Sequence, residues 1–265
     1  MQRPLIMGIV NVTPDSFSDG GRFLHFDRAL EHARQLIAEG ADILDIGGES
    51  TRPGAAEVSA VQEIERVLPV VRALRGGPVP LSVDTSKPEV MRAALDEGAA
   101  IINDVRALEA PGAVELVAQR DCGVVLMHMQ GTPVTMQADP SYADVVHEVS
   151  EFLRARREQV LQAGVAPERI VLDPGFGFGK RGVHNRRLLA QLGELRALGQ
   201  PLLVGLSRKA ALGEMTGRPV DQRLVASVVA ALLAIQAGAH IVRVHDVAAT
   251  RDAIAVWDAV RQEQP

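Results

Sequence analysis

The feature that most constrains the fold of this chain is a repeating order of segments. Eight short apolar runs occur along its 265 residues, and each is followed by a polar stretch and then by an amphipathic one. The spacing between the runs, about 20 to 45 residues, is too long for hairpins and suits βα units. The runs are continuously apolar, as is typical of parallel strands buried on both faces. The predicted strands cover residues 5–10, 43–46, 81–83, 101–102, 124–127, 170–172, 201–206 and 241–244.

This repeat predicts an α/β fold, a (β/α)8 TIM barrel, that spans residues 1–265 as a single domain. The length suits one barrel of roughly 250 residues. The sequence contains no linker, low-complexity tract or charge run that would divide the chain. Hydrophobic residues make up 47% and aromatic residues 3% of the chain, so we expect a core of Val, Leu, Ile and Ala.

Local signals mark the starts of several predicted helices. Asp27 is a candidate cap of the first helix. Ser59 with Gln62, and Ser86 with Glu89, have the spacing of capping boxes. These signals predict helices over residues 27–39, 59–74 and 86–98, and amphipathic patterns predict further helices over 142–163, 185–198, 222–237 and 249–262.

Charge and cysteine content narrow the class of protein. The net charge of −5 argues against non-specific nucleic-acid binding, which needs a basic surface. The sequence has no apolar run of roughly 18 residues and no signal-peptide pattern at its start, so we expect no membrane partner. The single cysteine, Cys122, excludes an internal disulfide and fits a reducing compartment. We therefore expect a cytoplasmic protein.

The polar residues at the ends of the predicted strands carry the functional signal. In a barrel these ends converge on one face, where active sites of this fold lie. One or two polar strand ends would be ordinary, because strand ends meet loops and solvent, but all eight ends carry them and so indicate a site. The residues are Asn11, Asp45, Asp84, Asn103 with Asp104, His128, Asp173, Ser207 with Arg208 and Lys209, and Arg243 with His245 and Asp246.

One group of these residues suits a polar heteroaromatic ring. Asp84, Asn103 and Asp173 combine carboxylates, which only accept hydrogen bonds, with an amide, which also donates them. A guanidine-like ring edge pairs in a bidentate manner with one carboxylate. Taken singly, Asp84 or Asp173 could instead cap the following helix.

A second group suits an anion. Arg52, Arg243 and His245, together with Asn11, have the chemistry that binds a phosphate group. Taken singly, His245 could be a surface histidine and Arg52 could be solvated. The two groups together predict a polar heterocycle that carries a phosphate ester.

Two further motifs carry weaker signals. The glycine-rich segment 175–179 lacks both the P-loop ending and the Rossmann spacing, but its glycines would let the backbone approach a flat ligand closely. His128 lies between Met127 and Met129, and no His-x-x-x-His or Cys cluster accompanies it. A role in the core or wall of the site is therefore favoured over metal binding.

In combination, these motifs closely resemble the dihydropteroate synthase family of the folate pathway. The resemblance covers nearly the whole chain, from Met7 to about Val256. It rests, in order, on NVTPDSFSDGG from Asn11, DIGGESTRPG from Asp45, VDT from Val83, INDV from Ile102, MHMQG from Met127, DPGFGFGK from Asp173, GLSRK from Gly205 and RVHD from Arg243.

The resemblance implies a transferase that joins 4-aminobenzoate to 6-hydroxymethyl-7,8-dihydropterin diphosphate, with Mg²⁺ as cofactor, and releases pyrophosphate and 7,8-dihydropteroate. It also implies that the enzyme is a sulfonamide target. In the family, the pterin is held at the positions matching Asp84, Asn103, Met127, Asp173 and Lys209, of which Asp84, Asp173 and Lys209 are the catalytic group. The diphosphate is held at those matching Asn11, Arg243 and His245, with the metal at Asn11. The aminobenzoate is surrounded by those matching Phe17, Thr51, Arg52, Pro53, Phe178 and Ser207.

Two positions depart from the family pattern, namely Arg106, where a small residue is common, and Ala210, where many members have serine. Neither departure changes the implied reaction class. Apolar positions around residues 226–235 suggest a homodimer interface, although they could simply pack on the barrel.

Two rival functions belong to other classes. A pterin-binding methyltransferase domain would use a related pocket for methyl-tetrahydrofolate and pass the methyl group to a corrinoid partner. The loop 51–54 and the cations Lys209, Arg243 and His245 disfavour it, because that ligand has no diphosphate. A barrel that serves only as an interaction protein would have lost polar residues at several strand ends, and this chain has kept them.

Overall fold

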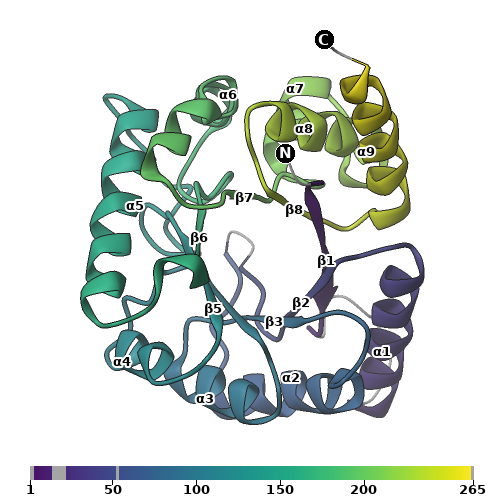
Figure 1. The fold of residues 1–265 in the computed structure, drawn as a ribbon, viewed down its shortest axis with the longest axis vertical. Helices are drawn as coiled ribbons and strands as arrows, with labels where there is room; N and C mark the ends of the chain where they lie inside the picture. The colour runs from purple at the N-terminus through teal and green to yellow at the C-terminus, as the bar shows by residue number, and fades with distance from the viewer. Residues whose placement is uncertain (1–2, 14–21, 52–53, 264–265) are drawn as a thin grey trace.

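The computed structural model describes residues 3–13, 22–51 and 54–263. In this part of the chain eight parallel strands form the centre of the molecule, and helices surround them (Figure 1). The strands are β1 (Leu5–Asn11), β2 (Ile43–Gly47), β3 (Leu81–Asp84), β4 (Ile101–Asp104), β5 (Gly123–Met127), β6 (Ile170–Asp173), β7 (Leu203–Val204) and β8 (Ile241–Val244). Each lies within about two residues of its predicted range, except that β7 is shorter.

The sheet closes into a barrel. Its hydrogen-bonded order is β6-β5-β4-β3-β2-β1-β8-β7. Between the two ends of this order, a parallel bridge joins Leu172 to Leu202, and the Leu172 N–H donates to the Pro201 carbonyl at 2.9 Å. The predicted TIM barrel is confirmed, and all eight carboxyl ends point to one rim.

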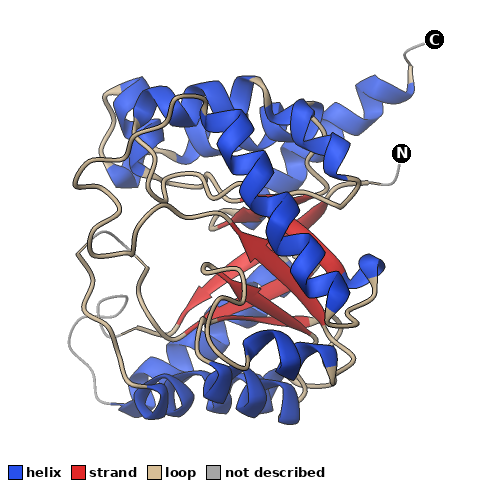
Figure 2. Ribbon diagram, turned by 90° about the vertical axis from the view of Figure 1, so that its left-hand side faces the viewer, coloured by secondary structure: helices blue, strands red, loops and turns tan. Residues whose placement is uncertain are grey.

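The helices form a layer outside the strands (Figure 2). Their apolar faces pack on Val, Leu, Ile and Ala side chains of the outer barrel surface, as the composition predicts. They are α1 (Arg22–Ala38), α2 (Ala60–Leu74), α3 (Pro88–Asp96), α4 (Ala113–Ala118), α5 (Val145–Gln162), α6 (Gly182–Ala190), α7 (Ala210–Thr216), α8 (Leu224–Gln236) and α9 (Val247–Gln262).

A separate apolar cluster fills the inside of the barrel near its amino end. We call it the barrel plug. Its fully or nearly fully buried members come from early positions of four strands and from β7, and two half-buried side chains pack against them. The plug closes the amino end, so that only the carboxyl end can admit a ligand. Its members are Met7, Ile43, Val125, Leu203 and Ile241, with Ile101 and Val171.

The helix starts test the capping predictions. Ser59 caps α2 with Gln62 in a complete capping box, as predicted. Asp27 does not cap α1, because that helix begins five residues earlier at Arg22. Ser86 is also not a cap, since its hydroxyl donates to the Asp104 carboxylate and α3 begins at Pro88 without a side-chain cap.

Besides α1, three helical segments differ from the predicted ranges. The sequence predicted no helix at α4 or α7, which have only 6 and 7 residues and so show little periodicity. The predicted helix over 185–198 is two elements, α6 and the 3-10 helix η3 (Leu192–Leu198). None of the helices in the described residues is long and apolar enough to cross a bilayer.

Candidate active site

The strand register places a polar layer directly above the barrel plug. Successive side chains of a strand alternate between the inside and the outside of the barrel. The residue two positions after a plug residue therefore also points inward, toward the carboxyl rim. Five polar or sulfur-containing side chains reach the barrel interior in this way, namely Asp45, Asn103, Met127, Asp173 and Arg243.

Arg243 joins two of the carboxylates in this layer. Its Nε donates to Asp45 Oδ2 at 2.6 Å, and its second nitrogen donates to Asp84 Oδ2 at 2.9 Å. Asn103 Nδ2 donates to the same Asp45 oxygen at 3.0 Å. Asp45 Oδ1 is buried with no hydrogen-bond partner among the described residues, so an acceptor is left over in the network. The predicted phosphate-binding arginine thus touches the predicted ring-binding carboxylate.

The single positive charge of Arg243 cannot neutralise both Asp45 and Asp84, and the pKa of Asp84 is raised as a result. Burial raises the pKa of the Asp84 carboxyl group from 3.8 to about 7, and the negative charges of Asp45, Glu63 and Asp104 act in the same direction. The positive charge of Arg243 opposes the rise. Around neutral pH this carboxyl group can therefore exchange its proton when a ligand arrives.

Asp173 and Lys209 form the second charged part of the site. Asp173 Oδ1 accepts the Gly175 N–H at 2.7 Å, so this carboxylate is fixed by the backbone two residues on. Burial raises the pKa of Asp173, and the nearby charge of Lys209 opposes the rise. Burial lowers the pKa of the Lys209 ammonium from 10.5 to about 8, against the attraction of Asp173.

The ammonium of Lys209 is held over the loop that follows β6. Its Nζ donates to the Phe176 carbonyl and lies 4.4 Å from the centroid of the Phe178 ring. Such a cation–π contact favours the charged amine. Phe178 is half-buried.

Ser207 and His245 meet at the rim where the chain leaves the neighbouring strands β7 and β8. The Ser207 hydroxyl is 3.0 Å from His245 Nδ1 and accepts the His245 backbone N–H at 3.2 Å. Between them in the chain, Arg208 has φ 59° and pairs with Asp246. A predicted aminobenzoate residue and a predicted diphosphate residue are therefore neighbours.

Asn11 ends β1 beside Gly47 of β2. A Cβ atom added to Gly47 would lie 3.6 Å from Asp84 Cβ and 4.0 Å from Asn11 Oδ1. The glycine thus leaves the rim open between the amide and the carboxylate. Thr51 is half-buried after β2, whereas Phe17, Arg52 and Pro53 lie outside the described residues.

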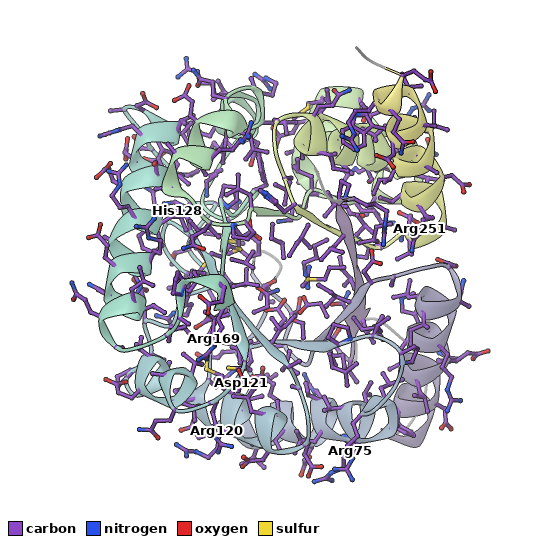
Figure 3. All side chains as sticks on the ribbon, in the orientation of Figure 1. Arg75, Arg120, Asp121, His128, Arg169 and Arg251 are labelled. Carbon is purple, nitrogen blue, oxygen red and sulfur yellow. The ribbon has the colours of Figure 1, made fainter. Side chains whose placement is uncertain are left out.

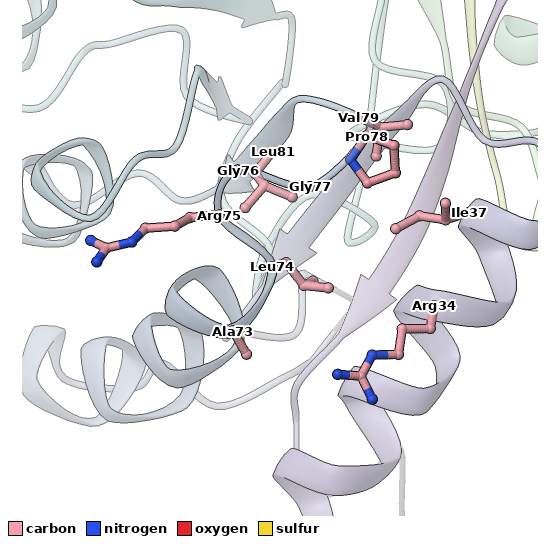
Figure 4. Close-up of a pocket in the computed structure, with 10 residues that line it drawn as sticks. All are labelled: Arg34, Ile37, Ala73, Leu74, Arg75, Gly76, Gly77, Pro78, Val79 and Leu81. Atoms are coloured by element: carbon pink, nitrogen blue, oxygen red, sulfur yellow. The ribbon is translucent and has the colours of Figure 1, made fainter.

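A surface hollow of about 370 Å³ lies at the other end of the barrel (Figure 4). It is lined by the end of α2, the following turn and the first residue of β3, with Arg34 and Ile37 of α1 on its other side. This hollow faces the amino ends of the strands, while the charged residues described above face the carboxyl ends. It is not part of the site.

Comparison with known proteins identifies the family. A family model described as "Pterin binding enzyme" matches residues 7–245. The dihydropteroate synthase of Neisseria meningitidis serogroup B is 55% identical over 98% of this chain and 94% of its own length. The chain belongs to the dihydropteroate synthase family.

Solved structures of family members agree with this assignment. The Xanthomonas albilineans dihydropteroate synthase with 4-aminobenzoic acid superimposes with a TM-score of 0.94 at 55% identity, covering 99% of this chain and 94% of that one. The Yersinia pestis enzyme in complex with a sulfonamide drug superimposes with a TM-score of 0.93 at 50% identity, covering 98% and 95%.

The two departures from the dihydropteroate synthase pattern lie at the surface. Arg106 is exposed, so its side chain is not part of the barrel interior, and its backbone N–H donates to Asp104 Oδ1 at 2.8 Å. Ala210 is exposed at the start of α7, one residue after Lys209.

The side chains at the rim can be compared with those that a magnesium ion, implied by the dihydropteroate synthase resemblance, would need. Mg²⁺ keeps several waters and is usually bound by one or two protein oxygens plus substrate phosphates. The described part of the chain contains no group of three or more His, Cys, Asp or Glu side chains placed to hold a metal. The Asn11 amide oxygen at the open rim fits an ion that is shared with a diphosphate.

Two charged side chains at or near the site, Asp45 and Lys87, had no predicted role. Asp45 was noted only as a strand end, although it is the centre of the Arg243 network. Lys87, next to the β3 end, donates to Glu49 Oε2 and Glu63 Oε2, each at 2.6 Å. The only feature of the sequence that connects Lys87 with the site is its position three residues after Asp84. His128 is buried, as the wall role predicted.

Proposed function

We infer that this chain joins 4-aminobenzoate to 6-hydroxymethyl-7,8-dihydropterin diphosphate and releases pyrophosphate, the reaction of its family. The observation that carries this inference is the convergence of Asp84, Asn103, Asp173 and Lys209 inside the carboxyl end of one barrel. These side chains have the donors and acceptors of a pterin site, and the chain that carries them is 55% identical to a dihydropteroate synthase.

The pterin subsite is built from the polar layer. We assign the amino-pyrimidine edge of the pterin to Asp173, whose orientation is fixed by the Gly175 N–H. Asp84 and Asn103 bind the remaining ring donors and acceptors, and Lys209 binds a ring acceptor from the rim side. Met127, which pairs with Asp173 in the sheet, contributes an apolar wall.

The diphosphate subsite lies at the rim around β1 and β8. Arg243 and His245 supply positive or donor groups, and Asn11 would hold Mg²⁺ together with the phosphate oxygens. When bound, the metal would neutralise charge on the leaving pyrophosphate. Arg243 now pairs with Asp45 and Asp84, so diphosphate binding requires it to share or exchange these partners.

The 4-aminobenzoate subsite lies between the Phe178 ring, Ser207 and Thr51. Phe17, Arg52 and Pro53 complete it by family resemblance and lie outside the described residues. A sulfonamide, which mimics the aminobenzoate, competes for this subsite.

The side chains support a dissociative route. Departure of pyrophosphate leaves an electron-poor methylene carbon on the pterin, and the buried Asp173 carboxylate stabilises the developing positive charge. The amine of 4-aminobenzoate then attacks this carbon to form the new C–N bond, and the nitrogen releases one proton to solvent. No covalent enzyme intermediate is required, because Arg243 and His245 stabilise the leaving group directly.

We also propose that the enzyme is a cytoplasmic homodimer. Val225, Val229 and Leu233 are exposed on α8 at a spacing of four residues, and therefore form one apolar stripe. Val256 and Val260 of the neighbouring α9 are also exposed. A two-fold copy of this surface would cover the apolar side chains of both helices.

The reaction is tested by pyrophosphate release from the pterin diphosphate with Mg²⁺, measured with and without 4-aminobenzoate. We expect release that depends on 4-aminobenzoate and yields dihydropteroate. An absence of release combined with binding of methyl-tetrahydrofolate would instead support the methyltransferase function. Failure to bind either ligand would indicate a barrel without this chemistry.

A further inference from the structure

A lysine is buried behind the Asp173 side of the site. The Lys180 side chain is only 2% exposed, and no carboxylate hydrogen-bonds to it in the described residues. Its Nζ lies 2.8 Å from His128 Nδ1, 2.9 Å from the Gly175 carbonyl and 3.1 Å from the Phe178 carbonyl. Burial of an amine among neutral acceptors costs free energy, so its retention needs a reason.

The nearest partners of Lys180 are two carbonyl oxygens and an imidazole nitrogen. Burial lowers the pKa of His128 to about 2, and the charge of Lys180 acts in the same direction, so the imidazole is neutral. Its Nδ1 lies 2.8 Å from Lys180 Nζ, so the two side chains share a hydrogen bond. Burial also lowers the pKa of Lys180, with attraction by Asp173 acting against it and repulsion by Lys209 acting with it.

Lys180 fixes a loop whose carbonyls are all bound by side chains. Five successive carbonyl oxygens, from residue 175 to residue 179, accept hydrogen bonds from side-chain donors in the loops that follow β5, β6 and β7. The Gly175 and Phe178 carbonyls accept from Lys180, that of Phe176 from Lys209, that of Gly177 from Gln137 at 2.6 Å and that of Gly179 from Tyr142 at 2.8 Å.

The loop also packs tightly against the segment after β5. A Cβ atom at Gly175 would lie 1.8 Å from the His128 carbonyl oxygen, and one at Gly179 would lie 2.4 Å from that of Gln130. Both glycines have positive φ, 69° and 60°. The backbone therefore approaches the neighbouring loop too closely for other side chains, and the Lys180 amine links the two loops.

We propose that Lys180 is a positioning residue for the transfer reaction. Its buried amine holds the 175–179 loop so that the Phe176 carbonyl and the Phe178 ring fix Lys209 beside Asp173. The proposal rests on the proposed function, since it assigns to Lys180 the geometry of that function's pterin site. Lys180 itself touches no substrate and acts through Lys209.

A matched control lies at the opposite end of β6. Arg169 is a half-buried cation that also binds backbone carbonyls, with Nε 2.6 Å from the Cys122 oxygen and a terminal nitrogen 2.7 Å from the Val117 oxygen. Figure 3 labels both Arg169 and His128, the neighbour of Lys180. Loss of Arg169 should affect the fold in a similar way, but away from the carboxyl rim.

The test compares Lys180→Met with Arg169→Met in steady-state pyrophosphate release, at a temperature where thermal unfolding curves show both variants folded. We expect Lys180→Met to lower kcat/KM for the pterin diphosphate at least 10-fold and Arg169→Met to change it less than 3-fold. Lys180→Gln, which keeps a donor in the cavity, provides a second variant if Lys180→Met does not fold, and we expect an intermediate loss.

A double-mutant cycle separates positioning from general destabilisation. If Lys180 acts through Lys209, adding Lys180→Met to Lys209→Met causes no further loss of pterin-diphosphate affinity. Fully additive losses, or a Lys180 variant with the activity of the Arg169 control, would overturn the proposal. Wild-type protein is assayed in parallel, and its failure to release pyrophosphate would instead overturn the proposed function.

Discussion

At the scale of single residues, the site combines carboxyl groups whose pKa is raised by burial with amines whose pKa is lowered by burial. Burial raises the pKa of Asp84 to about 7 and lowers that of Lys209 to about 8. Two groups with such neighbouring values can both adjust their charge when a ligand binds. This arrangement suits a site that must bind a neutral heterocycle and then stabilise a cation.

Replacement of Asp173 by Asn tests the electrostatic part of the mechanism. The amide is isosteric and can still accept the Gly175 N–H, so the fold should be retained. We expect kcat to fall at least 100-fold, because about 3 kcal/mol of electrostatic stabilisation is typical for one such group. Circular dichroism and turnover of the variant provide the measurement. Near-normal turnover would contradict the proposed role.

The pH dependence of kcat/KM tests the two perturbed groups. Asp84 must be ionised, so activity should rise as pH increases through about 7. Lys209 must be protonated, so activity should fall as pH increases through about 8. Lys209→Arg should remove the basic limb, because arginine stays charged in this range. If the fall of kcat/KM at high pH is unchanged in this variant, that fall must come from a group other than Lys209.

The raised pKa of Asp84 also makes the free energy of unfolding depend on pH. A carboxyl group whose pKa is raised on folding favours the folded state at low pH, and this contribution is lost as pH rises from about 4 to about 7. The wild-type free energy of unfolding should therefore fall over this window relative to that of Asp84→Asn.

Replacement of Ser207 by Ala tests whether the reaction proceeds without a covalent intermediate. The Ser207–His245 contact resembles an activated serine, but the dissociative route uses Ser207 only to bind 4-aminobenzoate. We expect a KM for 4-aminobenzoate that is several-fold higher and a kcat within about 5-fold of wild type. Loss of all turnover would favour a nucleophilic serine.

At the scale of elements, an ion cluster anchors the loop that follows β2. Lys87, at the start of α3, binds Glu49 of this loop and Glu63 of α2. Glu63 is fully buried, whereas Glu49 also accepts the Val58 N–H at 2.9 Å. Glu49 therefore ties both ends of the loop segment 49–58 to the helices beneath it.

Glu49→Ala should loosen this loop without removing the partner of the buried Glu63. Because Thr51 lies two residues further on, we expect a KM for 4-aminobenzoate about 5-fold higher, with a smaller change for the pterin diphosphate. Glu97→Ala, which breaks the exposed Arg72–Glu97 pair, is the control and should leave both constants unchanged. Equal effects of both variants would refute a specific role for Glu49.

At the scale of the whole molecule, the two ends of the barrel have different roles. The barrel plug closes the amino end, and the polar layer two residues further along the strands forms the site. The outer surface adds one feature, the apolar stripe of α8, where Val225 is 73% and Val229 50% exposed. This stripe is the basis of the proposed dimer.

Val229→Glu tests the homodimer. A charge at the middle of the stripe should dissociate the dimer while leaving the monomer fold intact, because the side chain is half exposed in the single chain. Analytical ultracentrifugation of wild-type and variant protein measures the change. Val61→Glu, at an exposed position on α2, is the control and should remain dimeric. A wild-type protein that sediments as a monomer would contradict the proposal.

The sequence by itself determined the barrel, because eight continuously apolar runs at βα spacing leave few other ways to bury both faces of each strand. It also determined which strand ends are polar, and the inward register of Asn103, Asp173 and Arg243 then follows from the two-residue period of a strand. It missed α4 and α7, which are too short to show a helical period, and it placed caps at Asp27 and Ser86 where other contacts prevail.

Only the tertiary structure decided which of these side chains touch one another. Arg243 and Asp45 are 198 residues apart in the chain, yet their side chains lie 2.6 Å apart. Arg243 also contacts Asp84 at 2.9 Å, and this contact joins the phosphate and ring groups of the sequence prediction. Lys180 and His128, 52 residues apart, are likewise joined only by the packing of two loops. Closure of the barrel sets these distances, and local sequence patterns carry no information about how far apart two strands are around the ring.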